Sequence, residues 1–215
     1  MPNGTAELLS ACRVPDSVHS GNFGGVWEIR RHEVPVQLRR FAGMEDGEQR
    51  RFTALHRWTA ETLSDQWGEI VMEDTPRELR RHLPILLAAE RRVLVSGLGL
   101  GCVVRGLLAV RRVTHIDVIE IDASILAHVG KEFIGNPRIA LHHGDALTVA
   151  WPGGSHWEFA WHDVWSEERH LAVVHAELLA RYSQWCDRQG AWQLPRAVRD
   201  KWPRGLLGAR RRTAA

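Results

Sequence analysis

Three acidic residues stand where runs of apolar residues, which predict buried strands, come to an end. Glu120 ends the strand in "VIEID", Asp145 follows "RIALHHG", and Asp163 follows "WEFAWH". Carboxyl ends of parallel strands meet at one edge of a sheet, where open α/β proteins bind their ligands. Carboxylates at that edge can accept hydrogen bonds from hydroxyl and amino groups or face a positive charge. The pattern predicts a binding site for a nucleotide-like ligand.

A glycine-rich turn precedes these acids. The predicted strand "RVLVSG" runs into a turn with Gly97, Gly99 and Gly101, and a helical pattern follows. No lysine follows the glycines, which excludes the phosphate-binding loop that ends in Gly-Lys-Ser/Thr. The dinucleotide fingerprint G-x-G-x-x-G requires glycine where Cys102 stands, so it fits poorly.

Each acid also has a purely structural interpretation. A carboxylate after a strand often caps a helix or forms a turn, and for a single residue this is as good an explanation as a ligand contact. Four successive predicted strands end in the expected residue types, the first in the glycine-rich turn and the next three in an acid. This agreement favours a ligand site for the set.

The elements that must position these residues alternate between strand and helix. Pro76 opens a predicted helix over 76–90, capped by Asp74 or Thr75, with Leu79, Leu83, Leu86 and Leu87 on one face. Strands are predicted at 92–97, 115–122, 138–146 and 157–165, and helices at 101–111, 123–133 and 167–188. This rhythm predicts an α/β fold with a mainly parallel sheet and helices on both faces. No strand is predicted after the last helix, so we expect a truncated sheet of four parallel strands.

The chain divides into three predicted regions. Residues 1–71 form an N-terminal extension with short strands, two within 24–41 and a third that begins at 67 and runs to 74. Residues 72–190 form the ligand-binding domain, and 191–215 form a basic tail.

Composition narrows the class of protein. The 215 residues are 44% hydrophobic and 25% charged, with a net charge of +2, which suits one soluble domain. Cys12, Cys102 and Cys186 lie far apart, which fits a cytoplasmic protein. No membrane span is predicted, short basic runs do not indicate nucleic-acid binding, and no histidine spacing predicts a metal site.

These motifs resemble those of the class I S-adenosylmethionine-dependent methyltransferase superfamily, and most closely its spermidine synthase-like branch. The G-x-G-x-G turn is usual in that superfamily, and Val95 stands two residues before the first glycine as in that branch. Glu78, His82, Leu83 and Pro84 are similar to the Glu-x-x-x-His-Leu-Pro helix of the branch. The resemblance covers about residues 72–165.

The resemblance implies a Rossmann-like methyltransferase fold and a cofactor. The cofactor would be S-adenosylmethionine or a derivative, decarboxylated S-adenosylmethionine or methylthioadenosine. Glu120 would hold the ribose, Asp145 would mark the adenine, and Asp163 or His162 would orient or deprotonate the acceptor. Strand alternation favours Asp163 over His162, and Trp161 and Trp165 would line the site. The full cofactor-binding set is Gly97, Leu98, Gly99, Gly101, Glu120, Ile121, Asp145, Ala146, Asp163 and Trp165.

The departures from the branch concern its amine substrate. Ser166 stands where the branch has a second aspartate, and Pro76 stands where it has a tyrosine. Spermidine synthesis is therefore not expected. Three hypotheses stay open: a methyltransferase acting on an unidentified small-molecule acceptor, an enzyme that cleaves the cofactor by hydrolysis or elimination, and a cofactor-binding module without turnover. The apolar stripe of helix 167–188 and an exposed sheet edge also predict a homodimer.

Overall fold

The chain folds into two sheets. The computed structural model describes residues 4–34, 51–59, 68–164 and 168–192. Among these residues, an antiparallel sheet of four strands in the order β1-β2-β3-β4 precedes a parallel sheet of five in the order β7-β6-β5-β8-β9. The antiparallel strands are β1 (Gly21–Phe23), β2 (Trp27–Glu33), β3 (Arg51–Arg57) and β4 (Glu69–Glu73). The parallel strands are β5 (Arg91–Ser96), β6 (Val113–Glu120), β7 (Ile139–His143), β8 (Trp157–His162) and β9 (Cys186–Ala191).

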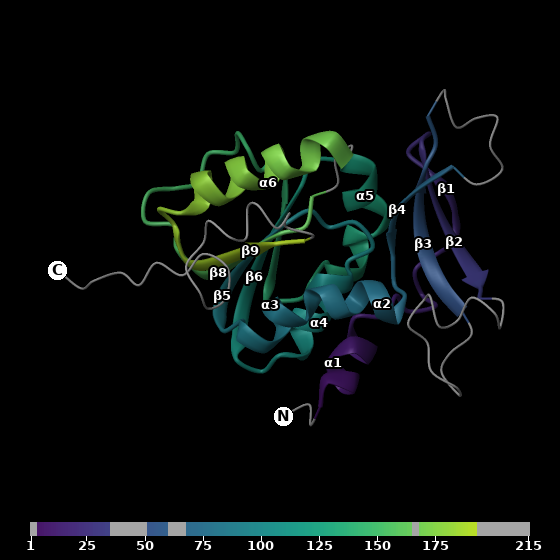
Figure 1. Cartoon of the computed structure of the whole chain (residues 1–215), viewed down its shortest axis with the longest axis horizontal. Helices are drawn as coiled ribbons and strands as arrows, with labels where there is room; N and C mark the ends of the chain where they lie inside the picture. Colours follow the sequence, from purple (N-terminus) through teal and green to yellow (C-terminus); the bar gives the residue numbers. More distant parts are fainter. Residues whose placement is uncertain (1–3, 35–50, 60–67, 165–167, 193–215) are drawn as a thin grey trace.

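The parallel sheet has its switch point beside β5. Strands β6 and β7 extend the sheet to one side of β5, and β8 and β9 extend it to the other. Ligands of open α/β sheets bind at the carboxyl ends of the two strands where the order reverses. The predicted fold class, an α/β fold with a mainly parallel sheet and a small N-terminal β extension, is confirmed. Figure 1 shows the antiparallel sheet on the right, beside the parallel sheet.

Helices cover both faces of the parallel sheet, which explains the continuous apolar sequence of β5. Val93 and Val95 are fully buried in a cluster that includes Leu107 of α4 (Cys102–Ala109). Leu94, which points the other way, is fully buried with Leu178 of α6 (Glu168–Tyr182). In Figure 1, α6 lies above the sheet, and α3 and α4 lie below it.

The remaining helices are short. They are α1 (Thr5–Ala11), α2 (Pro76–Leu79), α3 (Leu83–Ala88) and α5 (Ala123–His128), with 3₁₀ turns at Arg80–His82 and Gly130–Phe133. Thr75 caps α2, because its hydroxyl accepts a hydrogen bond from the backbone N–H of Glu78 at 3.3 Å. Leu87, predicted on the buried face of this region, is 58% exposed. No helix within the described ranges has both the length and the apolar character needed to span a membrane.

The prediction of four parallel strands is wrong, because a fifth one follows α6. The predicted helix 167–188 ends at Tyr182 in the structure, and Cys186–Ala191 pairs with β8 as β9. The sequence "CDRQGA" lacks the apolar alternation that predicts a strand. Its backbone pairs with β8, and its polar side chains add contacts to that strand. Gln189 Oε1 lies 3.2 Å from His162 Nε2, and the Arg188 guanidinium lies 5.7 Å from the centre of the Phe159 ring.

The N-terminal sheet also differs from the prediction. Strand β2 lies within the predicted 24–41 segment, whereas the second strand predicted there falls on residues outside the described ranges. Strands β1 and β3 were not predicted. Strand β4 matches the predicted strand near 67–74 and crosses the predicted boundary between residues 71 and 72.

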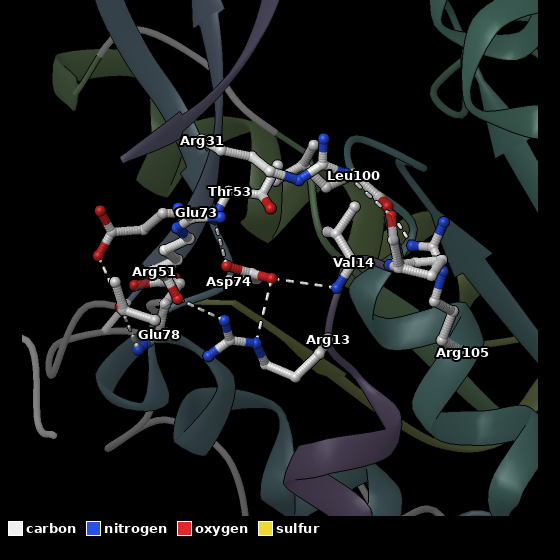
Figure 2. Close-up of polar contacts among 12 residues, drawn as sticks. Arg13, Val14, Arg31, Arg51, Thr53, Glu73, Asp74, Glu78, Leu100 and Arg105 are labelled. Atoms are coloured by element: carbon white, nitrogen blue, oxygen red, sulfur yellow. Dashed lines mark hydrogen bonds and ion pairs between the residues drawn. The ribbon is translucent and has the colours of Figure 1, made fainter. Parts of the chain in front are cut away.

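A buried aspartate joins the N-terminal segment to this sheet (Figure 2). Asp74 is fully buried at the end of β4. Its carboxylate accepts hydrogen bonds from the backbone N–H groups of Val14 at 3.0 Å and Thr53 at 2.6 Å, and it pairs with Arg13 at 3.2 Å. Burial raises the pKa of Asp74, and the Arg13 charge and the two N–H donors act in the opposite direction. This carboxylate therefore ties the N-terminal segment to β3 at the end of β4.

A second polar contact links the two sheets directly. The indole N–H of Trp27, on β2, donates to Asp122 Oδ2 at 2.7 Å, just after β6. We expect Trp27→Phe to lower the free energy of unfolding by about 1.5 kcal/mol, since the phenyl ring keeps the packing but cannot donate to the carboxylate. Urea unfolding measures this loss. Trp58→Phe, which removes an indole bond to Glu28 within the N-terminal sheet, should not weaken the contact between the sheets. Equal free energies of unfolding for Trp27→Phe and wild type would contradict the link.

Candidate functional site

The glycine-rich turn between β5 and α4 lies too close to other parts of the chain to carry side chains. Gly97, Gly99 and Gly101 have φ values of 93°, 50° and 76°, in the left-handed region that favours glycine. A Cβ at position 97 would lie 2.1 Å from the carbonyl oxygen of Asp163, after β8. A Cβ at position 99 would lie 2.8 Å from the sulfur of Met72, on β4. The turn is therefore packed between β8 and the N-terminal sheet.

Glu120 connects the end of β6 to this turn. Its Oε2 accepts hydrogen bonds from the backbone N–H groups of Leu98 at 2.7 Å and Gly99 at 3.5 Å, and its Oε1 accepts from the N–H of Asp122 at 2.9 Å. A carboxylate offers about four acceptor positions. The contact from Gly99, at 3.5 Å, is at the limit of a hydrogen bond. Glu120 can therefore hold the turn through Leu98 and Asp122 and still has about two acceptor positions for a ligand.

Asp145 combines both interpretations that its sequence position allowed. Its Oδ1 accepts a hydrogen bond from the backbone N–H of Leu147 at 2.8 Å, which is the interaction of a turn former. The residue also lines the same cavity as Glu120. The structural role therefore orients a carboxylate that faces the cavity.

Asp163 follows β8 and is buried. Burial raises the pKa of its carboxyl to about 8, and the neighbouring carboxyls of Glu78 and Glu120 add to the increase. A carboxyl in such surroundings keeps its proton near neutral pH and releases it when a positive charge lies beside it. Strongly perturbed acids in cavities are typical of functional sites.

One cavity brings these residues together. It has a volume of about 440 Å³, which lies within the range of small-molecule sites. One wall comes from the carboxyl edge of the parallel sheet, and the other comes from the N-terminal sheet. Seven predicted residues line it: Gly97, Gly99, Glu120, Ile121, Asp145, Ala146 and Asp163.

The cavity is strongly acidic. Among the described residues that line it, five carry carboxyl groups and one, Arg57, carries a guanidinium. The carboxyls belong to Glu78, Glu120, Asp122, Asp145 and Asp163. Apolar side chains such as Leu55, Val71 and Ile125 form much of the rest. This combination suits a ligand with an apolar or aromatic body and a positive charge.

Three predicted site residues lie next to the cavity wall rather than in it. Leu98 contributes its backbone N–H to Glu120. Gly101 precedes α4, and a Cβ there would meet the Phe133 ring at 2.8 Å. His162 points away from the cavity: its Nδ1 lies 3.0 Å from the Ser96 hydroxyl, and burial lowers its pKa to about 3. This position favours Asp163 over His162 as the group that meets an acceptor.

The two tryptophans predicted beside Asp163 have different outcomes. Trp161 is buried in the larger core, and its ring lies edge-on to His82 with 6.2 Å between the ring centres. It is not among the described residues that line the cavity. Trp165 lies outside the described residues. Among the described residues, the tryptophans in the wall are instead Trp27, on β2, and Trp192, after β9.

Sequence analysis missed the residues that close the cavity. Glu78 on α2 accepts hydrogen bonds from the Trp192 indole N–H and from Arg81 at 2.8 Å, and burial raises the pKa of its carboxyl. Met72 and Trp27 enter the wall from the N-terminal sheet. Glu78 belongs to the Glu-x-x-x-His-Leu-Pro motif noted in the sequence. No local pattern marks Met72, Trp27 or Trp192 as site residues.

Comparison with solved structures finds similar folds at low sequence identity. No protein-family model matches the chain, and no curated protein matches it. A spermidine synthase from Thermotoga maritima aligns over 81% of this chain and 56% of its own, with 15% identity and a TM-score of 0.49. The 23S rRNA methyltransferase ErmE aligns over 52% of this chain and 44% of its own, with 18% identity and a TM-score of 0.42.

A dimethyladenosine transferase from Plasmodium falciparum gives similar values. It aligns over 54% of this chain and 40% of its own, with 15% identity and a TM-score of 0.41. The chain thus spans between 40% and 56% of the length of these three structures. At these identities and TM-scores, the similar structures do not indicate the function of this chain.

Proposed function

We propose that this protein binds S-adenosylmethionine in the cavity and transfers a group from it, most simply the methyl group, to a small-molecule acceptor. The observation that carries the proposal is the meeting of three carboxyls with the glycine-rich turn. Glu120, Asp145 and Asp163 come from the ends of different parallel strands and line one cavity at the switch point of the sheet. An acidic site with apolar walls fits an adenosyl group attached to a cation.

Each residue has a distinct part in this proposal. Glu120 accepts hydrogen bonds from the ribose hydroxyls, and Asp145 accepts from the adenine amine. Ile121 and Ala146 supply apolar contacts to the purine ring. Gly97 lets the chain pass close to β8, so that Asp163 can face the reacting centre.

Group transfer from a sulfonium requires little of the protein beyond positioning the sulfonium and the acceptor. A sulfonium activates its own carbon substituents, because its leaving group departs as a neutral thioether. The walls exclude water and hold the acceptor in line. Asp163 takes the proton of the acceptor, since a nearby positive charge lowers the pKa of a carboxyl.

A calorimetric titration tests the proposal. We expect S-adenosylmethionine to bind the wild-type protein with a dissociation constant on the order of 10 μM. NAD, which shares the adenosine group but carries two phosphates, should not bind, since the cavity is acidic. Binding of NAD without binding of S-adenosylmethionine would contradict the proposal.

The size of the cavity supports a second candidate function, cleavage of the cofactor itself. A volume of about 440 Å³ is near the small end of ligand sites, which run from about 300 to 1,000 Å³. Little space remains for an acceptor beside an adenosyl compound. Incubation of the pure protein with S-adenosylmethionine alone separates the two functions, because only cleavage releases methylthioadenosine or adenosine without an acceptor. Binding without cleavage, and without transfer to any acceptor, would leave a binding module.

A further inference from the structure

The loop that carries Asp145 and Ala146 into the cavity wall is attached to α6 by a hydroxyl group. Tyr182, the last residue of α6, donates its O–H to the carbonyl of Ala146 at 2.9 Å. The Tyr182 side chain is fully buried, and it is not among the described residues that line the cavity. Tyr182 therefore reaches the cavity wall through the backbone of Ala146 and does not face the cavity itself.

The direction of this hydrogen bond follows from the partners of the hydroxyl. The indole nitrogen of Trp151 lies 3.2 Å from the Tyr182 oxygen, and an indole N–H can only donate. The hydroxyl therefore accepts from Trp151 and has its own hydrogen for the carbonyl of Ala146, which can only accept. Burial raises the pKa of Tyr182, so the hydroxyl keeps this hydrogen near neutral pH.

The Ala146 carbonyl belongs to the same peptide group as the N–H of Leu147. That N–H donates to Asp145 Oδ1 at 2.8 Å. A peptide group is planar, so a bond that fixes its carbonyl also fixes the direction of its N–H. Tyr182 thus holds one end of this peptide group, and the other end holds the Asp145 carboxylate.

Other hydrogen bonds hold the ends of the loop rather than this central peptide group. The backbone N–H groups of Thr148 and Val149 donate to the carbonyl of Asp145 at 3.0 Å and 2.8 Å. The guanidinium of Arg181 donates to the carbonyl of Val149. The bond from Tyr182 therefore adds what these contacts do not supply, a fixed orientation of the peptide group that meets the Asp145 side chain.

We propose that Tyr182 is a positioning residue, whose hydroxyl directs the Asp145 carboxylate at the adenine amine of the ligand. The inference rests on the proposed function, since it concerns the adenine contact of the same cavity. It assigns a role to a buried side chain of α6 that acts through Asp145 and does not touch the ligand. Without the hydroxyl, the peptide group between Ala146 and Leu147 can rotate, and the carboxylate loses its fixed direction.

The test compares two ligands that differ in the group that Asp145 would contact. Calorimetry measures the affinities of the full chain for S-adenosylmethionine and for S-inosylmethionine, its 6-oxo analogue, in which an oxygen replaces the amine. A carboxylate can accept a hydrogen bond from the amine but not from the oxygen, so wild type should bind S-adenosylmethionine about tenfold more tightly. In Tyr182→Phe, which keeps the ring and loses the hydroxyl, this ratio should fall to about threefold. A general loss of stability would weaken the binding of both ligands equally and leave the ratio unchanged.

Trp58→Phe serves as the matched control. It also removes one hydrogen bond of an aromatic side chain, that of the indole N–H to Glu28, and Trp58 is not among the described residues of the cavity wall. The ratio of the two affinities should therefore stay at the wild-type value in this variant.

The possible outcomes separate the inference from the proposed function. An unchanged ratio in Tyr182→Phe, or an equal decrease in both variants, would overturn the role of Tyr182 and leave the proposed function standing. Equal affinities of wild type for the two ligands would overturn the contact between Asp145 and the amine, and the role of Tyr182 with it. Failure of both ligands to bind wild type would overturn the proposed function.

Discussion

Asp163→Asn is expected to make the protein more stable than wild type at pH 8 and to leave its stability nearly unchanged at pH 4. Burial, with the nearby carboxyls of Glu78 and Glu120, raises the pKa of Asp163 from 3.8 to about 8. Between these values the unfolded chain releases the proton while the folded protein keeps it. The unfolded state then binds fewer protons, so the free energy of unfolding falls as the pH rises.

The expected effect is large. Within this window, each pH unit lowers the free energy of unfolding by about 1.4 kcal/mol for one such group. The total decrease across the window therefore has an upper limit on the order of 5 kcal/mol. Asparagine has nearly the same shape and no proton to release, so the variant lacks this decline. Urea unfolding at several pH values between 4 and 8 measures the difference between the two proteins.

A surface aspartate provides the matched control. The Asp16 side chain is fully exposed, so Asp16→Asn should follow the wild-type pH dependence. If the difference between Asp163→Asn and wild type stayed constant from pH 4 to pH 8, the carboxyl would not be held protonated in the folded state.

Glu120→Ala is expected to weaken binding of S-adenosylmethionine about 100-fold, which corresponds to ~2.7 kcal/mol. The variant removes the acceptor proposed for both ribose hydroxyls, and charge-assisted bonds of this kind are the stronger ones. It also frees the N–H groups of Leu98 and Gly99, which loosens the turn. Asp145→Ala, which removes one proposed contact to the adenine amine, should weaken binding about tenfold. Calorimetric titration measures both losses.

Glu90→Ala is the control for this pair. Glu90 is exposed and precedes β5, at the edge of the parallel sheet opposite to the cavity, so its loss should not change the affinity. Unchanged affinity in both Glu120→Ala and Asp145→Ala would remove the proposed site from the carboxyl edge of the sheet.

The part of the site that sequence reasoning found depends on local patterns. Val93, Leu94 and Val95 of β5 are buried on both faces of the sheet and form an apolar run, and the glycines after the strand mark a turn that cannot carry side chains. Glu120 and Asp145 follow neighbouring parallel strands, and parallel pairing alone brings their ends to one edge. The order of residues along the chain was therefore enough to group them.

The wall that closes the cavity depends on contacts between distant segments. Trp27 meets Asp122 across 95 positions, and Trp192 meets Glu78 across 114. No periodicity within either segment encodes such a contact. Strand β9 was missed because its backbone pairs with β8 while its side chains form no apolar stripe. Gln189 instead contacts the buried His162. The sequence thus indicated the carboxyl edge of the parallel sheet but not the wall that lies across the cavity from it.

The most direct test of the central claim is a crystal structure of the protein with S-adenosylmethionine. We expect density for the cofactor in the cavity beside Gly99, with the ribose hydroxyls within hydrogen-bond distance of Glu120, the adenine amine near Asp145, and the sulfur facing Asp163. Density for the cofactor at any other place on the protein, with the cavity empty, would contradict the account.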